Sequence, residues 1–400
     1  MSVDLRITFM LLVLLAVSFA LFAETLTFGF MSDDFVLVHR VRTEGFFMSW
    51  GGDGSLFFRP VTVASYFTDH LLWDTNPAGY HLTNLLLHFC CALLVFLAAI
   101  EFFPDRNTAL LAGFIFLLLA CHSESVSWVA GRTDVLATAF GLASLVLFLK
   151  GNMLAVPLFV GALFSKESAI VMPFIWVLYA RMKGLRRTAI ALAGIGVSFF
   201  YLLVRVLDSN IGAEMRAAGS CLTLLSSFEN LFRYSFRVFI PPLPGSFRPL
   251  LSRTPWLLPV VLTGILASAV ILYRYRKGNW KKLAFHISCF VVALLPVVFM
   301  SVSLFDTRSE RFLYLPGVFA VFALLQWTFT VFSRRVATLL LLVFALVQGG
   351  MLYRSNRNWK KAGELCLEIA GDCEAVPLDN YNGAYVFRNG LKEARLLLGE

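Results

Sequence analysis

Two adjacent carboxylates, Asp33 and Asp34, follow the first long apolar stretch of this 400-residue chain. Acidic side chains at the edge of a membrane-type helix are costly to desolvate, so they mark a place where chemistry or transport occurs. One of them could act as a general base that takes a proton from a hydroxyl group, while the other orients it or binds substrate. The alternative is a solvated turn at a helix C-terminus, where carboxylates oppose the helix dipole.

Four cations could bind an anionic group at the same membrane boundary. They are Arg59, Lys166, Arg308 and Arg311. Arginine suits a phosphate because its planar fork matches two phosphate oxygens, whereas lysine acts as a point charge. The alternative is that these side chains reach the membrane surface by themselves or form internal ion pairs with neighbours such as Glu167 and Glu310.

Five further side chains are candidates for lining a polar cavity beside Asp33. They are His81, His122, Glu124, Arg132 and Glu310. His81 shares one helical face with Asn84 and His88, and that face either lines the cavity or forms hydrogen bonds to neighbouring helices. A divalent metal is possible but not favoured, because two ligands, His122 and Glu124, do not make a site. No metal ligand is assigned and no cofactor is expected.

The composition identifies the elements that must position these groups. Hydrophobic residues make up 58% of the chain, charged residues 15%, and the mean hydropathy is +0.76, as in an all-α polytopic membrane protein. About eleven transmembrane helices are predicted, several of them shorter than the ~20 residues that a bilayer requires. They cover residues 5–23, 81–103, 108–121, 133–149, 153–165, 168–180, 188–207, 255–273, 283–301, 312–332 and 336–352. Short spans indicate broken or tilted helices around a cavity.

The charge pattern predicts the topology. Basic residues cluster at 181–187, 274–282 and 334–335, which are alternate loops. The net charge of +9 therefore indicates a positive-inside membrane protein and no nucleic-acid partner. The N-terminus is then cytoplasmic, and the Asp33 loop and the C-terminal tail lie outside. The first apolar segment is interpreted as a retained helix, because no small-residue cleavage site precedes Glu24.

The chain divides into a transmembrane domain, residues 1–353, and a short external helical tail, residues 354–400, with a degenerate tetratricopeptide-like pattern. External loop 24–80 carries aromatic residues at helical spacing, as in helices that lie on a membrane surface. External loop 208–256 contains an amphipathic segment, residues 226–240, which could instead be a short span. The tail is expected to pack on the external domain or on a partner.

Several motifs occur in a particular order along the chain. They are the pair 33–34, Phe58-Arg59-Pro60, the run 76–88, residues 122–124 with 131–134, Ser165-Lys166-Glu167, and the run 310–316. With these motifs, the chain resembles the GT-C superfamily of glycosyltransferases that depend on polyprenyl-phosphate sugars. The resemblance is to the protein O-mannosyltransferase-like branch, which includes the transmembrane-and-tetratricopeptide proteins.

The resemblance implies a GT-C-like fold and an inverting transfer of one sugar from a polyprenyl phosphate to an acceptor hydroxyl on the external face. Asp33 would be the base, and the cations near Arg311 would hold the lipid phosphate, a role that protein cations fill for monophosphate donors. The partners are the donor, a protein or glycan acceptor, the lipid bilayer and an envelope protein at the tail. The bacterial inner membrane is the favoured location.

Two other functions fit parts of the pattern. A transporter or flippase of lipid-linked sugars would also carry charges in the membrane, but such proteins often contain inverted repeats and bind substrate near the bilayer midplane. The polar groups here gather on one face, which favours the enzyme. A degenerate family member could instead serve as a scaffold subunit of a glycan-assembly complex, with the tail as its docking surface.

Overall fold

The computed structural model describes residues 5–46, 58–103, 105–207, 224–243 and 280–371, with single positions between 260 and 274. Within these ranges all regular structure is helical, which confirms the all-α prediction. Most of the predicted span 255–273, much of external loop 208–256 and residues 372–400 of the predicted tail lie outside the described residues.

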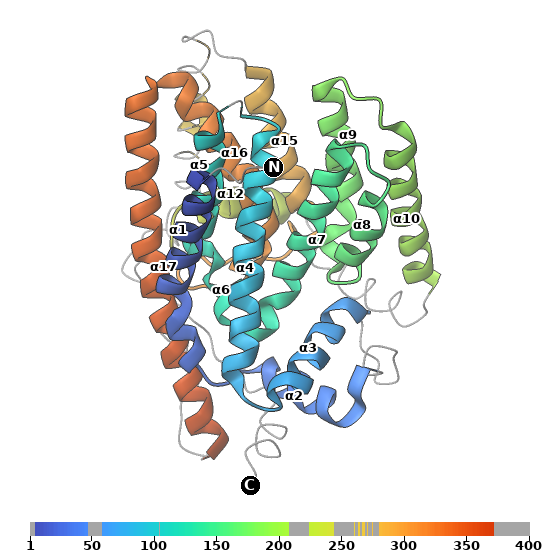
Figure 1. Cartoon of the computed structure of the whole chain (residues 1–400), viewed down its shortest axis with the longest axis vertical. Helices are drawn as coiled ribbons and strands as arrows, with labels where there is room; N and C mark the ends of the chain where they lie inside the picture. Colours follow the sequence, from blue (N-terminus) through green and yellow to red (C-terminus); the bar gives the residue numbers. More distant parts are fainter. Residues whose placement is uncertain are drawn as a thin grey trace.

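Most of the helices run along the long axis of the molecule (Figure 1). The longer ones are α1 (Leu5–Phe22), α4 (Pro77–Ile100), α5 (Arg106–Leu118), α7 (Arg132–Leu149), α10 (Thr188–Leu207), α15 (Trp280–Leu294), α16 (Tyr314–Val331) and α17 (Arg334–Gly371). The shorter ones are α8 (Ala155–Leu163) and α9 (Met172–Lys183). Each predicted apolar segment other than 255–273 overlaps one of these helices, because continuous apolar sequence is the signal that both share.

The predicted number of spans is not supported. Among the described residues five helices are long and apolar enough to cross a membrane, or six if α5 and the short helices that follow it, bent by 55°, form one broken span. Helices α8, α9 and α15, with 9, 12 and 15 residues, are shorter than the ~20 residues that cross a bilayer. The chain is therefore a multi-pass membrane protein with five or six candidate spans in its described part.

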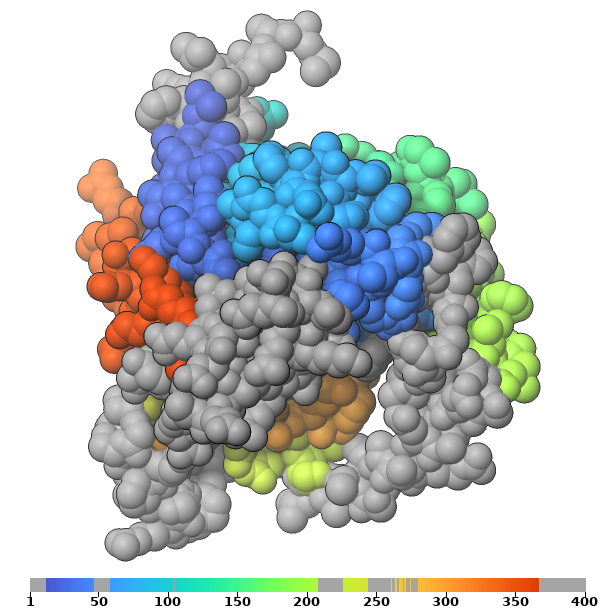
Figure 2. Space-filling view, turned by 90° about the horizontal axis from the view of Figure 1, so that it is seen from below, coloured from blue at the N-terminus to red at the C-terminus, as the bar shows by residue number. Residues whose placement is uncertain are grey.

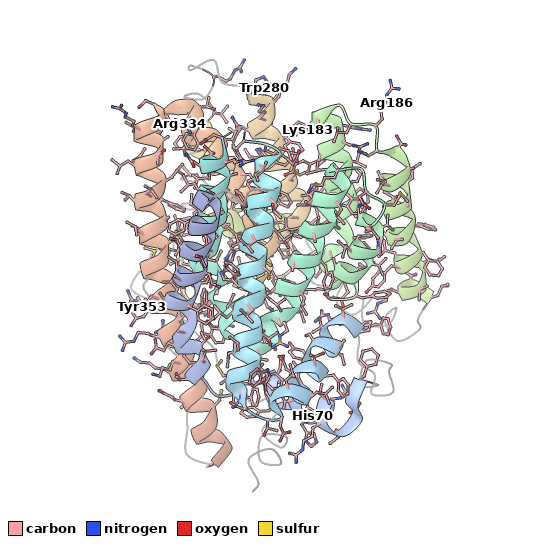
Figure 3. All side chains as sticks on the ribbon, in the orientation of Figure 1. His70, Lys183, Arg186, Trp280, Arg334 and Tyr353 are labelled. Atoms are coloured by element: carbon pink, nitrogen blue, oxygen red, sulfur yellow. The ribbon has the colours of Figure 1, made fainter. Side chains whose placement is uncertain are left out.

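The two ends of the bundle differ in character (Figure 3). Lys183, Arg186 and Arg334 lie at one end, and His70 lies at the other. The first external loop forms two helices at the His70 end, α2 (Asp33–Glu44) and α3 (Pro60–Trp73). The aromatic residues with helical spacing are thus in a helix, α3, as predicted. Helices α2 and α3 and the basic residues Lys183, Arg186 and Arg334 thus lie at opposite ends of the molecule.

Helix α17 continues without a break through the predicted domain boundary at residue 353. Its 38 residues span about 57 Å, well beyond the ~30 Å hydrocarbon core of a bilayer. Arg334 and Arg335 at its start are exposed, the exposed side chains from Val336 to Val347 are apolar, and those after Tyr353 are charged, as at Arg354 and Arg357. The far end of α17 lies at the same end of the molecule as α2 and α3, and this end is seen in the view from below (Figure 2).

Two main apolar clusters hold the fold together, and a small third one joins Ala137, Ala162 and Ala169. The larger fills the bundle, and the smaller lies at the end where α2, α3 and the last turns of α17 meet. The smaller cluster contains Phe28, Phe30, Met31, Tyr66, Tyr80, Trp128 and Trp359. The amphipathic segment predicted in the second external loop is helix α12 (Leu224–Arg237). The smaller cluster thus packs together the end of the molecule that carries Asp33 and Asp34, which we call the polar end.

The close contact between α4 and α5 generates a stability prediction. A Cβ atom on Gly113 would lie 2.8 Å from the backbone oxygen of Ala92 in α4, whereas one on Gly196 of α10 would meet open space. Gly113→Ala should therefore lower the free energy of unfolding by about 1–3 kcal/mol, because helices cannot approach through an added methyl group. Thermal unfolding of the detergent-purified protein measures this. The control, Gly196→Ala, should be neutral or slightly stabilising, and equal losses in both variants would contradict the packing argument.

Candidate active site

The Asp33–Asp34 pair begins a helix. Helix α1 ends at Phe22, and the chain reaches α2 through the 3₁₀ turn η1 (Ala23–Thr27) and an extended segment. The alternative of a turn at a helix C-terminus is therefore wrong, because the pair lies in the first turn of α2. The helix dipole stabilises carboxylates at that position. Ser32, which precedes the pair, has φ +51° and ψ −117°, a conformation that costs about 1–3 kcal/mol in a residue other than glycine. The surrounding packing must hold this turn in place.

Asp34 is fully buried and ties the turn to the polar segment before α7. Its Oδ2 accepts a hydrogen bond from the backbone N–H of Met31 at 3.0 Å, and its Oδ1 accepts one from Ala130 at 2.8 Å. Burial raises the pKa of Asp34 to about 8, and the two backbone donors act in the opposite direction. Asp33 is only half-buried. Asp33 is therefore the more accessible member of the pair, and Asp34 shapes the turn.

Trp128 contacts both Met31, in the turn before Asp33 and Asp34 (the carboxylate turn), and the cation Arg311. Its indole N–H donates to the backbone oxygen of Met31 at 3.2 Å, and its ring stacks on Trp359 of α17 with centroids 6.4 Å apart. The guanidinium carbon of Arg311 lies 5.2 Å from the same indole. The structure thus brings two motifs from distant parts of the sequence, those around residues 33 and 311, onto one aromatic side chain.

Glu124 holds Arg311 in position. The buried carboxylate of Glu124 accepts from the backbone N–H of Arg311 at 2.8 Å and forms an ion pair with its guanidinium group. The Arg311 side chain keeps 26% of its surface exposed. It lies in the 3₁₀ helix η8 (Glu310–Leu313), directly after Ser309, which has φ +68°. The arginine is therefore fixed in position but still accessible to an anionic ligand.

Lys166 and Arg59 lie close to Arg311, each with its own carboxylate. Lys166 Nζ is 2.5 Å from Asp134 Oδ2 and 4.6 Å from the ring of Phe312, over which Arg311 also lies. Arg59 makes a two-pronged contact with Glu167. Burial lowers the pKa of Lys166 to about 8; Asp134 raises it, and the charges of Arg59 and Arg311 lower it further. These three cations therefore share one electrostatic environment.

Arg308 differs from the other three predicted cations. Its side chain is 47% exposed, and it pairs with Asp306 at 3.2 Å. Among the residues that the structure describes, no group of three or more His, Cys, Asp and Glu side chains could hold a metal ion.

The predicted cavity-lining residues are all inaccessible in this structure. Arg132 lies 2.6 Å from Asp69 of α3 and donates to Asn84 of α4, so that it joins three helices. Glu310 pairs with Arg237 of α12, and both are buried. Their role as cavity-lining groups stays a prediction.

The face of α4 that carries His81, Asn84 and His88 packs against neighbouring segments, as the second of the two alternatives predicts. His81 packs edge-on against Phe28, and Asn84 donates to the backbone oxygens of Val126 and Trp128. His88 Nδ1 lies 2.5 Å from the hydroxyl of Tyr314. His122 lies among aromatic rings, with its centroid 4.5 Å from that of Tyr314. These side chains hold α4 against the neighbouring helices and segments.

Sequence reasoning missed two partners, Asp69 and Arg237. Asp69 could have been found, because it lies on the same face of α3 as Thr62 and Tyr66, at helical spacing, and an acidic group on a buried face needs a cation. Arg237 was assigned to an amphipathic surface helix, and nothing local distinguishes it from the neighbouring Arg233, which pairs within α12.

The chain is similar to several curated proteins named protein O-mannosyl-transferase. It is 30% identical over 179 residues to Tmtc1 of Drosophila melanogaster, which covers 39% of this chain and 21% of the fly protein. A Caenorhabditis elegans protein of that name is 23% identical over 358 residues, 84% of this chain and 51% of the relative. Human TMTC3 is 30% identical over 95 residues, 24% of this chain and 10% of the relative.

These relatives confirm the resemblance that the motifs indicate. The chain has homologues among protein O-mannosyl-transferases, although the matches span about half or less of each relative's length. No protein-family model matches the chain, and no solved structure matches it significantly.

The different burial of the two carboxylates predicts different effects on stability. Asp34→Asn should lower the free energy of unfolding by about 1–3 kcal/mol, because an amide cannot accept from both backbone donors. Asp33→Asn should cost no more than about 0.3–1 kcal/mol, the value of one charge at a helix N-terminus. Thermal unfolding of the two purified variants measures the difference. A larger loss for Asp33→Asn would contradict the assignment of Asp34 as the structural member.

Proposed function

We propose that this protein is a membrane glycosyltransferase that moves one sugar from a polyprenyl-phosphate donor to an acceptor hydroxyl, with inversion at the anomeric carbon. The observation that carries the proposal is the placement of an accessible carboxylate, Asp33, and an accessible guanidinium, Arg311, on segments joined by Trp128. The names of the relatives support the class of reaction. A GT-C-like architecture belongs to the proposal, and about eleven spans would require the short helices to cross as parts of broken spans.

In the proposed reaction Asp33 takes the proton from the acceptor hydroxyl while the hydroxyl oxygen attacks the anomeric carbon. The bond between that carbon and the phosphate oxygen breaks on the opposite face of the sugar, which inverts the configuration. Polyprenyl phosphate leaves with the bonding electrons, and Asp33 then releases the proton to solvent. Holding donor and base in fixed positions supplies much of the rate enhancement in a transfer of this kind.

Arg311 is the proposed first ligand of the donor phosphate. Negative charge grows on the phosphate as the bond breaks, and a fixed cation next to it stabilises the transition state more than the ground state. Glu124 limits the motion of Arg311 and leaves part of it exposed. Arg308 would contact the phosphate from the exposed side, and Lys166 and Arg59 would add positive potential from the protein side.

The proposed orientation has a cytoplasmic N-terminus, with the active face and the C-terminal tail outside. Its support is the separation of the basic residues at Lys183, Arg186 and Arg334 from the α2 end of the molecule (Figure 3). The acceptor is a protein, as the relatives' names suggest, or a glycan. The bacterial inner membrane and an envelope protein that binds the tail complete the proposal.

Removal of the base tests the reaction. Asp33→Asn should reduce sugar transfer by at least about 10²-fold, because an amide cannot accept the proton. The assay uses purified protein with a panel of radiolabelled polyprenyl-phosphate sugars and measures sugar release and transfer. Thermal unfolding and gel filtration of the same preparation serve as the folding control. Turnover by folded Asp33→Asn at the wild-type rate would remove Asp33 from the mechanism.

The phosphate site has its own test. Arg311→Ala should weaken donor binding by about tenfold or more, whereas Arg311→Lys should lose less because it keeps the charge but not the fork. Binding of a polyprenyl phosphate to the purified variants measures this. The matched control is Arg357→Ala, which removes an exposed arginine of α17. Equal donor affinity in Arg311→Ala and the control would rule out the assigned phosphate role.

A further inference from the structure

A groove lies at the basic end of the bundle, far from the Asp33 turn. It has a volume of about 480 Å³ and is lined by residues of α1, α5, α16 and α17. Most of the lining side chains are apolar, among them Leu14, Leu110 and Phe329. Val13 and Leu342, which also line it, are exposed on the outer surface of the bundle. The groove is therefore accessible from the side of the bundle, where lipid surrounds a membrane protein.

The polarity of the groove changes along its length. Asp105 and Arg334 lie at the start of α5 and α17, and both helices run from there into the bundle. Phe114 and Leu342 lie about two turns farther along the same helices, roughly 12 Å away. The lining thus changes from charged to apolar in the direction from the membrane surface to its interior. A phospholipid has the same gradient from headgroup to acyl chain.

The charges at the mouth of the groove favour an anionic headgroup. Arg334 keeps 65% of its side chain exposed and pairs with Asp105, which also accepts from the backbone N–H of Thr108 and so caps α5. Arg106 and Arg335 follow these two residues directly in the sequence. Three arginines and one aspartate therefore lie at the starts of these two helices, and of the three arginines Arg334 lines the groove. The N-termini of α5 and α17 meet here as well, and their dipoles add positive potential.

We propose that this groove binds an anionic glycerophospholipid, with its phosphate at Arg334 and one acyl chain between α1, α5 and α17. The proposal does not depend on the proposed transfer reaction. The acyl chain would cover apolar side chains of α1 that the protein itself leaves exposed, such as Val13, and would join α1 to its neighbours. Since α1 leads into the Asp33 turn, the lipid would stabilise the whole bundle.

The test compares two lipids on the purified full chain in detergent. Dioleoyl-phosphatidylglycerol should remain bound in native mass spectrometry and raise the midpoint of thermal unfolding more than dioleoyl-phosphatidylcholine does. Arg334→Gln should weaken the phosphatidylglycerol complex by about fivefold, the usual effect of one cation near an anionic lipid, and reduce the preference between the two lipids. Leu342→Trp should reduce binding of both lipids because the larger ring fills the groove.

Two matched variants control for general surface effects. Leu339→Trp adds the same ring to an exposed position of α17 that does not line the groove, and Arg186→Gln removes a cation from the same end of the molecule. Both should bind phosphatidylglycerol as the wild type does. The proposal is overturned if Arg334→Gln and Leu342→Trp also bind it as the wild type does, or if the wild type binds the two lipids equally. Because Leu342 is exposed, its replacement leaves the packed core intact.

Discussion

The polar end of this protein depends on the indole of Trp128. Its N–H group holds the backbone of Met31, one face of the ring is stacked on Trp359, and the guanidinium of Arg311 lies near the same ring. A large flat side chain suits this position because it offers apolar surface and one directed hydrogen bond. Two segments that would act on opposite sides of one bond, at Asp33 and at Arg311, are thus positioned against a common rigid object.

Burial of charge in an apolar bundle imposes the second constraint. A buried charge or backbone group without a partner costs several kcal/mol, so each must find one within the protein. Arg132 finds Asp69, and Glu310 finds Arg237. At the 55° bend after α5, the side chain of Gln348 accepts from the backbone N–H of Ala120 and donates to the backbone oxygen of Phe239. A break in a buried helix therefore requires a polar side chain, such as Gln348, that pairs with the freed backbone groups.

Much of the fold could be predicted from the sequence because apolar segments and charge clusters are local signals. The helices overlap the predicted spans, and helix α2, which begins at Asp33, lies at the end opposite Lys183, Arg186 and Arg334. The number of spans could not be predicted in this way, because a short apolar run such as 153–165 does not reveal whether its helix crosses the bilayer. Composition alone cannot separate a crossing helix from one that is broken or tilted.

The candidate site shows the same limit. Asp33 and Asp34 are adjacent and chemically identical, yet one is half-buried and the other accepts two backbone hydrogen bonds inside the protein. The sequence offers Glu310 as an alternative ion-pair partner for Arg311, but Glu124, far away in the sequence, is the partner that the structure shows. These differences arise from tertiary contacts, and neither the spacing nor the type of the residues contains that information.

The unbroken course of α17 has a mechanical consequence. An α-helix is stiff along its axis, and this one reaches from Arg334 at the basic end to Trp359 and Cys366 beside the carboxylate turn. A shift of the helix along its axis at one end must therefore move the indole of Trp359, and with it the support of Trp128, at the other. The helix therefore couples the two ends of the bundle, so that an axial displacement at either end would reach the other.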